Sequence, residues 1–188
     1  MPIEVELKFP LGGNAPTATE VVDRLEAIGA VEHPTRHQHD HYYAHPGRDF
    51  AVTDEALRIR QDGQNVQLTY KGPLIDDVAK SRLELETGIE STEAAAGILE
   101  ALGFRLVRVV SKQRRPFELT WHTAGVEAVI DQVDGLGVFV ELETISDFDR
   151  HQAARDILLQ LAAELGLEDS ERRSYLGLLL QADSVEET

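Results

Sequence analysis

The sequence predicts an α+β fold, in which an antiparallel β-structure is flanked by helices. Three observations predict it: charged and apolar residues alternate in many short segments, capped helical segments lie between them, and 42% of the 188 residues are hydrophobic. This length and composition suit one globular domain with a substantial core. We expect that domain to span residues 1–182 and the acidic tail, residues 183–188, to be disordered.

The first segment sets the pattern. Between residues 3 and 9, the charged side chains of Glu4, Glu6 and Lys8 alternate with apolar ones. Strict alternation over this length predicts a β-strand with two unlike faces. By itself, this is the pattern of an outer strand whose charged face meets water.

The same alternation recurs along the chain. Turns are predicted near Asp62-Gly63 and Asp134-Gly135, each between two such segments. Another segment places Gln38, Asp40 and Tyr42 on one face. The charged faces together carry seven acids and eight bases: Glu4, Glu6, Glu84, Glu86, Asp131, Glu141 and Glu143, and Lys8, Arg58, Arg60, Lys71, Lys80, Arg82, Lys112 and Arg114.

Four helices are predicted between and after these strands. The first has a capping-box pattern in Thr17 and Glu20 and a stop at Gly29. The others occupy residues 91–104, 147–166 and 170–181. Several short segments of the first half of the chain also recur 72–80 residues later, as "EVELKF" does in "LELETG". This repetition predicts two half-sheets of similar plan that face each other.

The mixture of charges bears on how the strands are arranged. In an open sheet the charged faces would meet water, whereas two sheets closed on each other would make a barrel with a polar interior and helices outside. Acids and bases in similar number favour closure. Buried charges are costly even when they are paired, so divalent cations on the carboxylates and a polyanion on the bases would stabilise such an interior.

Composition limits the classes of partner. The net charge of −16 disfavours nucleic acid and anionic membranes, unless the bases are gathered in one place. Only four bases are lysines, and each lies in or beside an alternating segment. The absence of cysteine, of a visible signal peptide and of a long apolar run predicts a soluble, cytoplasmic protein. A homodimer stays open.

These residues carry a resemblance to a known family. The run Glu4-x-Glu6-x-Lys8, followed in order by "ALRIR", "TYKG", "RLELE", "KQRRPF", "DQVDGLGVFVELE" and "SYLGLL", resembles the CYTH, or triphosphate tunnel metalloenzyme, family. The resemblance runs from about residue 3 to residue 180 and implies an eight-stranded antiparallel β-barrel tunnel with a charged interior and flanking helices. One departure is Phe117, where members often have tyrosine.

The resemblance also implies roles for the charged residues, with Mg²⁺ or Mn²⁺ as cofactor. Glu4, Glu6, Glu141 and Glu143 would bind metal, with Asp131 assisting, and Glu84, Glu86 and Asp40 are expected to be catalytic. The bases that would hold phosphates are Lys8, Arg58, Arg60, Lys71, Lys112 and Arg114. Six bases suit a triphosphate better than a monophosphate.

The segment from Asp40 to Arg60 is most similar to the class IV adenylate cyclase branch. It favours conversion of ATP to cyclic AMP and pyrophosphate. Hydrolysis of tripolyphosphate, thiamine triphosphate or a nucleoside triphosphate is the alternative, because both reactions need the same clamp around the phosphates. A binding module without turnover, and a 5′-triphosphate RNA end as substrate, also stay open.

A cluster of histidines has a simpler interpretation. His37, His39 and His41 share one strand face at a spacing that could hold zinc. They alternate with Asp40, so a barrel that directs Asp40 inward places them outside. We expect an exposed strand face there.

Overall fold

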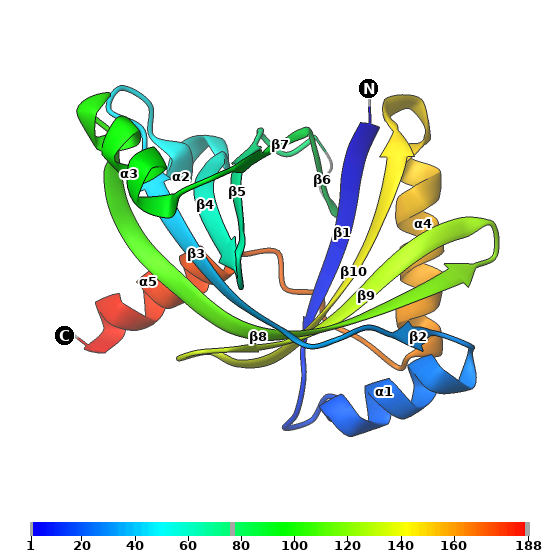
Figure 1. Cartoon of the computed structure of the whole chain (residues 1–188). Helices are drawn as coiled ribbons and strands as arrows, with labels where there is room; N and C mark the ends of the chain where they lie inside the picture. The colour runs from blue at the N-terminus through cyan, green and yellow to red at the C-terminus, as the bar shows by residue number, and fades with distance from the viewer. Residues whose placement is uncertain (1, 76–77, 187–188) are drawn as a thin grey trace.

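A strongly curved antiparallel sheet forms a nearly closed barrel, with helices on its outside and at one end (Figure 1). The computed structural model describes residues 2–75 and 78–186. Its strands are β1 (Pro2–Pro10), β2 (Val31–Glu32), β3 (Arg36–Ala44), β4 (Ala56–Asp62), β5 (Asn65–Lys71), β6 (Lys80–Arg82), β7 (Glu84–Ile89), β8 (Arg105–Trp121), β9 (Ala124–Val133) and β10 (Gly137–Asp147). Its helices are α1 (Ala18–Ala27), α2 (Phe50–Thr53), α3 (Thr92–Ala101), the short 3₁₀ turn η1 (Phe148–Arg150), α4 (His151–Glu164) and α5 (Tyr175–Glu186).

One interrupted strand brings the two edges of the sheet together. The strand order is β6-β1-β10-β9-β8-β3-β4-β5-β7, and the two-residue β2 pairs with β8 away from this path. Only Leu83 separates β6, which pairs with β1, from β7, which pairs with β5. Counting β6 and β7 as one strand gives the eight predicted strands. The interruption at Leu83 therefore lies where the barrel closes.

The two faces of the strands meet different environments. The apolar side chains of β1, Val5 among them, are buried in the main core between the barrel wall and helices α1 and α4. Glu6 and Lys8 on the opposite face are also buried, at 5% and 2% exposure. Both faces thus have little contact with bulk solvent, which is the arrangement of a closed barrel and not of an open sheet.

The predicted repetition is visible in the topology. Strands β3-β4-β5 form one antiparallel run and β8-β9-β10 another, and β3 joins them by pairing with β8. The first strand of each half pairs with the last strand of the other, β1 with β10 and β7 with β5. The two halves therefore exchange strands as well as facing each other.

The helix signals are confirmed at most termini. Thr17 caps α1 through a complete capping box with Glu20, and Ser91 caps α3. Gly166 follows α4 with φ of +66°, a conformation that glycine adopts without strain. The one-turn α2 was not predicted.

The C-terminal segment differs from the expected tail. Residues 183–186 form the last turn of α5, and Asp183 makes an ion pair with Arg108 of β8. This ion pair and the packing of Leu179 in a core cluster hold the helix beyond the predicted end. Residues 187–188 lie outside the described residues. Among the described helices, none has the length and hydropathy needed to cross a membrane.

Candidate active site in the barrel interior

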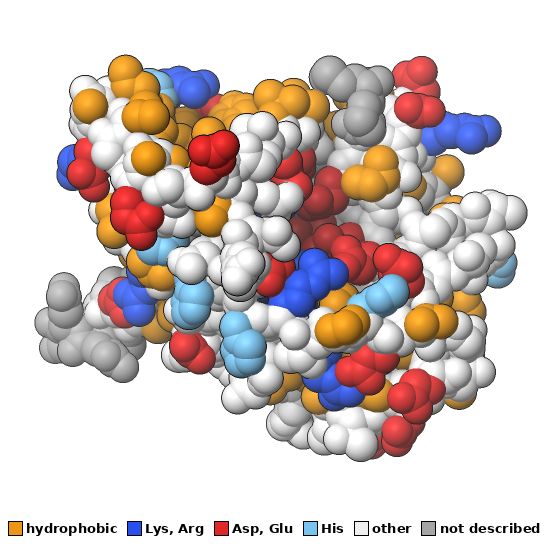
Figure 2. All heavy atoms as spheres, viewed as in Figure 1, with side chains coloured by type: hydrophobic (Ala, Val, Ile, Leu, Met, Phe, Trp, Pro, Cys, Tyr) orange, Lys and Arg blue, Asp and Glu red, His pale blue; other side chains and the backbone are white. Residues whose placement is uncertain are grey.

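The barrel surrounds a large, partly open cavity of about 1650 Å³. Figure 2 shows a hollow between the two sides of the barrel, with acidic side chains along it and basic ones at its lower end. All of the predicted site residues except Asp40 and Asp131 line this cavity: Glu4, Glu6, Lys8, Arg58, Arg60, Lys71, Glu84, Glu86, Lys112, Arg114, Glu141 and Glu143. The structure thus brings together residues from six strands that are far apart in the sequence.

Asp40 lies behind the arginines of β4. Its Oδ1 accepts from Nε of Arg60 at 2.6 Å, and its Oδ2 accepts from Nη2 of Arg60 at 2.7 Å and from Nη1 of Arg58 at 3.3 Å. Burial favours the neutral acid, but the charges of Arg58 and Arg60 hold the pKa of Asp40 well below its ordinary value. With 1% of its surface exposed, Asp40 is a counter-ion for the arginines.

Asp131 makes the corresponding contacts on the other half of the barrel. It binds Arg114 through both oxygens, at 2.8 and 2.6 Å, and accepts a hydrogen bond from the Tyr175 hydroxyl at 3.2 Å. Lys112 lies 3.2 Å from the same carboxylate. Asp131 is fully buried and its oxygens are committed to these donors. These contacts suit the positioning of bases better than the binding of a metal.

A second group of ion pairs lies where β1, β5, β6 and β7 meet. Nζ of Lys71 is 3.1 Å from Glu4 and also contacts Glu84, while Nζ of Lys80 is 2.6 Å from Glu6. Although burial opposes ionisation, Lys71 holds the pKa of Glu4 below its ordinary value. Glu84 behaves differently, because its burial outweighs the attraction of Lys71 and raises its pKa to about 7.

Two lysines near Tyr175 have pKa values below the ordinary value, although Lys112 lies beside Asp131 and Lys8 donates a hydrogen bond to the Arg173 carbonyl. Nζ of Lys8 lies 4.3 Å from the centre of the Tyr175 ring, and Nζ of Lys112 lies 5.1 Å from it. Burial, followed by the charge of Lys80, lowers the pKa of Lys8 to about 7. Burial and the charge of Arg114 lower the pKa of Lys112 to about 8. Both lysines would gain from an anion in the cavity.

Glu143 has the opposite imbalance. Within residues 2–75 and 78–186, no base lies within ion-pair distance of its carboxylate. Burial, followed by the charge of Glu4, raises its pKa well above the ordinary value, and Glu141 and Glu6 add to the effect. Together with Glu4, Glu6 and Glu141, Glu143 offers the oxygen donors and the charge that Mg²⁺ or Mn²⁺ requires.

A metal would nevertheless require these side chains to rearrange. Among the described residues, no three acids or histidines already form a cluster that could hold a metal ion. Glu4, Glu6 and Glu141 are instead held by Lys71, Lys80 and Arg114. If a polyanion attracted these bases, the carboxylates would be released toward a cation. By their chemistry, these carboxylates suit a divalent metal once they are released.

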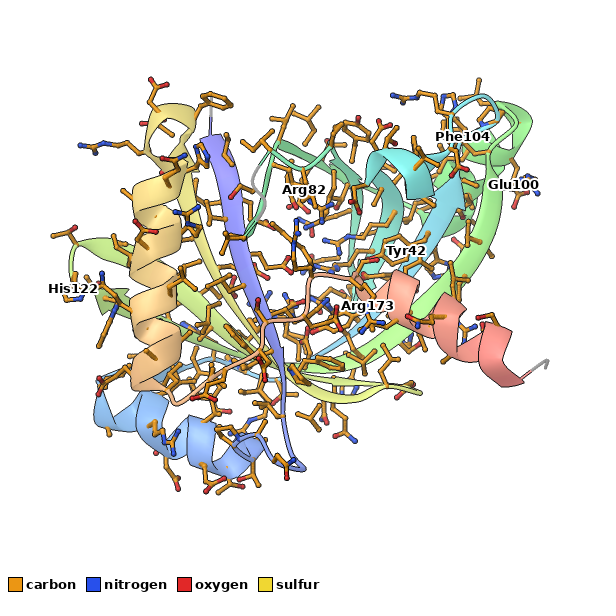
Figure 3. The ribbon with its side chains drawn as sticks, turned by 180° about the vertical axis from the view of Figure 1, so that it is seen from behind. Tyr42, Arg82, Glu100, Phe104, His122 and Arg173 are labelled. Carbon is orange, nitrogen blue, oxygen red and sulfur yellow. The ribbon has the colours of Figure 1, made fainter. Side chains whose placement is uncertain are left out.

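The cavity also contains residues that were not predicted to belong to the site. Lys80 and Arg82 line the cavity, and Figure 3 shows Arg82 pointing into the interior. Their alternation with Glu84 was the available signal, although the resemblance did not assign them a role. Tyr175 also lines the cavity; it lies in the "SYLGLL" segment of the resemblance, which did not assign it a role.

Two sequence observations have no part in the cavity. Phe117 is fully buried in the outer core, so its lack of a hydroxyl does not affect the charges inside. His39 of the histidine cluster contacts Ser111, and the cluster lies on the face of β3 opposite to Asp40. Figure 2 accordingly shows histidine side chains on the outer surface.

Comparison with known proteins agrees with this geometry. The CYTH domain family matches residues 2–175. The chain belongs to the CYTH family. It is 37% identical over 179 residues to "Putative adenylate cyclase MJ0240" of Methanocaldococcus jannaschii, covering 94% of this chain and 98% of that protein. It is 32% identical to "Adenylate cyclase CyaB" of Aeromonas hydrophila, covering 95% of this chain and 90% of that one.

A solved structure of similar sequence supports the fold directly. The PH1819 protein of Pyrococcus horikoshii superposes with a TM-score of 0.83 and 39% identity. The match covers 95% of this chain and 99% of that structure. The predicted fold, an antiparallel β-barrel with flanking helices, is therefore confirmed.

Proposed function

We propose that this CYTH protein is a divalent-metal-dependent enzyme that converts ATP to cyclic AMP and pyrophosphate. The observation that carries the proposal is the charged cavity, in which eight buried bases and the carboxylates of Glu4, Glu6, Glu141 and Glu143 face one space. The names of the two relatives, over nearly their full length, favour the cyclase.

The bases would orient the phosphate chain. Asp40 and Asp131 hold Arg60 and Arg114 through bidentate contacts, which fixes their guanidinium groups before substrate arrives. Held in this way, the phosphate chain of the substrate would present one phosphorus to one nucleophile. This is a proximity effect worth several orders of magnitude in rate.

The reaction itself needs few groups. The 3′-hydroxyl oxygen of the ribose would bond to the α-phosphorus while the bond from that phosphorus to the bridging oxygen of the β-phosphate breaks. Glu84 and Glu86, which face the cavity, would orient the bases, and one of these two carboxylates would accept the hydroxyl proton. A divalent cation on Glu4, Glu6, Glu141 and Glu143 would supply charge neutralisation for the phosphates and for the leaving pyrophosphate.

Product analysis tests the proposal. The protein would be incubated with ATP, tripolyphosphate and thiamine triphosphate, each with Mg²⁺ and with Mn²⁺. Cyclic AMP and pyrophosphate from ATP are expected. Release of phosphate from any of the three, without a cyclic product, would instead establish a triphosphatase. Absence of any product would contradict an enzymatic role.

Two neighbouring arginines offer a matched pair of variants. Arg114 faces the cavity, whereas Arg115 is paired outside with Glu32 at 2.9 Å. Because lysine cannot reproduce a bidentate guanidinium contact, Arg114→Lys should lower kcat/KM at least about tenfold. Arg115→Lys should leave it within about twofold. Equal effects of the two substitutions would argue against catalysis inside the barrel.

A further inference from the structure

Part of the lining of the charged cavity is apolar, where β3, β4, β8 and α5 come together. Tyr42 of β3, Ala56 of β4, Val107 of β8 and Leu176 and Leu180 of α5 line it there, and we call this set the end wall. Figure 3 places Tyr42 beside α5. Val107 and Leu180 keep 41% and 43% of their surface exposed, unlike the aliphatic residues that pack α5 onto the barrel. Aliphatic surface inside a cavity is best covered by an apolar ligand group.

A β-bulge turns Val107 toward the cavity. Tyr42 pairs with Arg108, but the next residue, Tyr43, pairs with Leu106, so β8 carries one extra residue at this point. In a regular strand Val107 would share the outer face with Val109, which does not line the cavity. Bulges commonly re-aim a side chain beside a functional site. Here the bulge adds an apolar side chain to the interior.

The end wall begins directly beside a phosphate-binding base. Tyr42 lies opposite Arg58 in the β3–β4 pairing, and Ala56 shares the face of Arg58 two residues earlier. Arg58 is 7% exposed, and its Nε is buried without a hydrogen-bond acceptor. An anionic oxygen of a ligand would satisfy this donor. The group attached to that phosphate would then extend along the end wall.

We propose that the end wall receives the heteroaromatic base of a nucleoside triphosphate. The proposal rests on the function proposed above, because it requires the phosphates to occupy the charged part of the cavity. The flat faces of a base suit a short aliphatic surface, and Arg105, on the same face as Val107 beyond the bulge, supplies donors for ring nitrogens. An extended alkyl chain would need a longer apolar path than five side chains provide.

Comparing the affinities for ATP and for tripolyphosphate separates the contribution of the nucleotide base from that of the phosphates. The affinities for ATP and for tripolyphosphate would be measured by isothermal titration in EDTA, with the parent and with Val107→Thr and Leu180→Ser. Because each variant removes apolar contact surface, we expect the Kd for ATP to rise about three- to tenfold. The Kd for tripolyphosphate should stay within about twofold. Leu159→Ser is the matched control, since Leu159 is 39% exposed on α4 and does not line the cavity.

The outcomes distinguish the two proposals. Loss of ATP affinity in both wall variants, with tripolyphosphate binding and the Leu159→Ser variant unchanged, would support the end wall. Unchanged ATP affinity, or equal weakening of both ligands, would overturn it while leaving a triphosphate site in place. A parent that binds neither ligand, in EDTA or with Mg²⁺, would instead contradict both the proposed function and the end wall.

Discussion

At the scale of single residues, the acids inside the barrel differ in how far they reach. Asp40 and Asp131 have short side chains, remain at the wall and bind arginines, whereas Glu141 and Glu143 line the cavity. Alternation predicts which face a residue occupies but not whether its side chain is long enough to reach the centre. We therefore now propose positioning roles for both aspartates, in place of the catalytic and metal-assisting roles that the resemblance implied.

The ion pairs of Asp40 with Arg58 and Arg60 predict that the stability of the protein depends on pH. The pKa of Asp40 is lowered in the folded protein, so its contribution to the free energy of unfolding is present above its unfolded pKa of about 3.9 and is lost as the pH falls below that value. Asp40→Asn leaves Arg58 and Arg60 without their counter-ion. We expect a loss of about 3 kcal/mol near pH 7, measured by urea unfolding, and a smaller loss at pH 3.

The exposed Asp23 on α1 is the control for this measurement. Asp23→Asn should change the free energy of unfolding by less than about 0.5 kcal/mol at both pH values. If the Asp40→Asn loss were the same at pH 3 as at pH 7, the ion pairs would not be its cause.

At the scale of elements, local signals predicted helices and strands well. The charged alternation of β1 and the capping box of α1 depend on neighbouring residues alone, and both are present in the structure. The bulge in β8 had no comparable signal, because no glycine or proline marks the extra residue near Arg108. The interruption at Leu83 arises from closure of the ring, which depends on strands distant in sequence.

The separation of outer helices from the inner cavity can be tested at the cap of α1. Thr17→Ala removes the side chain that accepts from the Glu20 amide, so we expect a loss of about 1 kcal/mol of stability and a fall in Tm of about 2–4 °C. Because α1 packs on the outer core, the Kd for tripolyphosphate at a temperature well below Tm should not change. A parallel loss of affinity would mean that α1 is coupled to the interior.

At the scale of the whole molecule, the acids and the bases inside the barrel are linked by ion pairs. In the free protein, bases and acids neutralise one another across the interior, except for Glu143 and the weakly compensated Lys8. The sequence predicted which residues would meet in the interior, but pairing is a property of three-dimensional distance. The pairing of the carboxylates with bases explains why no three acids or histidines among the described residues form a metal-binding cluster. Metal and polyanion should therefore bind cooperatively, each releasing the partner of the other.

This cooperativity predicts how ligands change the melting temperature. A ligand that binds only the folded state, at about 100 times its Kd, stabilises by about 2.7 kcal/mol, which for a chain of 188 residues is a rise in Tm of about 5–10 °C. We expect Mg²⁺ and tripolyphosphate together to raise Tm by more than the sum of their separate effects. Glu4→Gln and Glu141→Gln should remove most of that excess, because a neutral amide binds the cation weakly, while the exposed Glu26→Gln should keep it. Each comparison uses the shift from the variant's own ligand-free Tm, so a change in basal stability does not enter. An excess that survives in both cavity variants would place the metal away from these carboxylates.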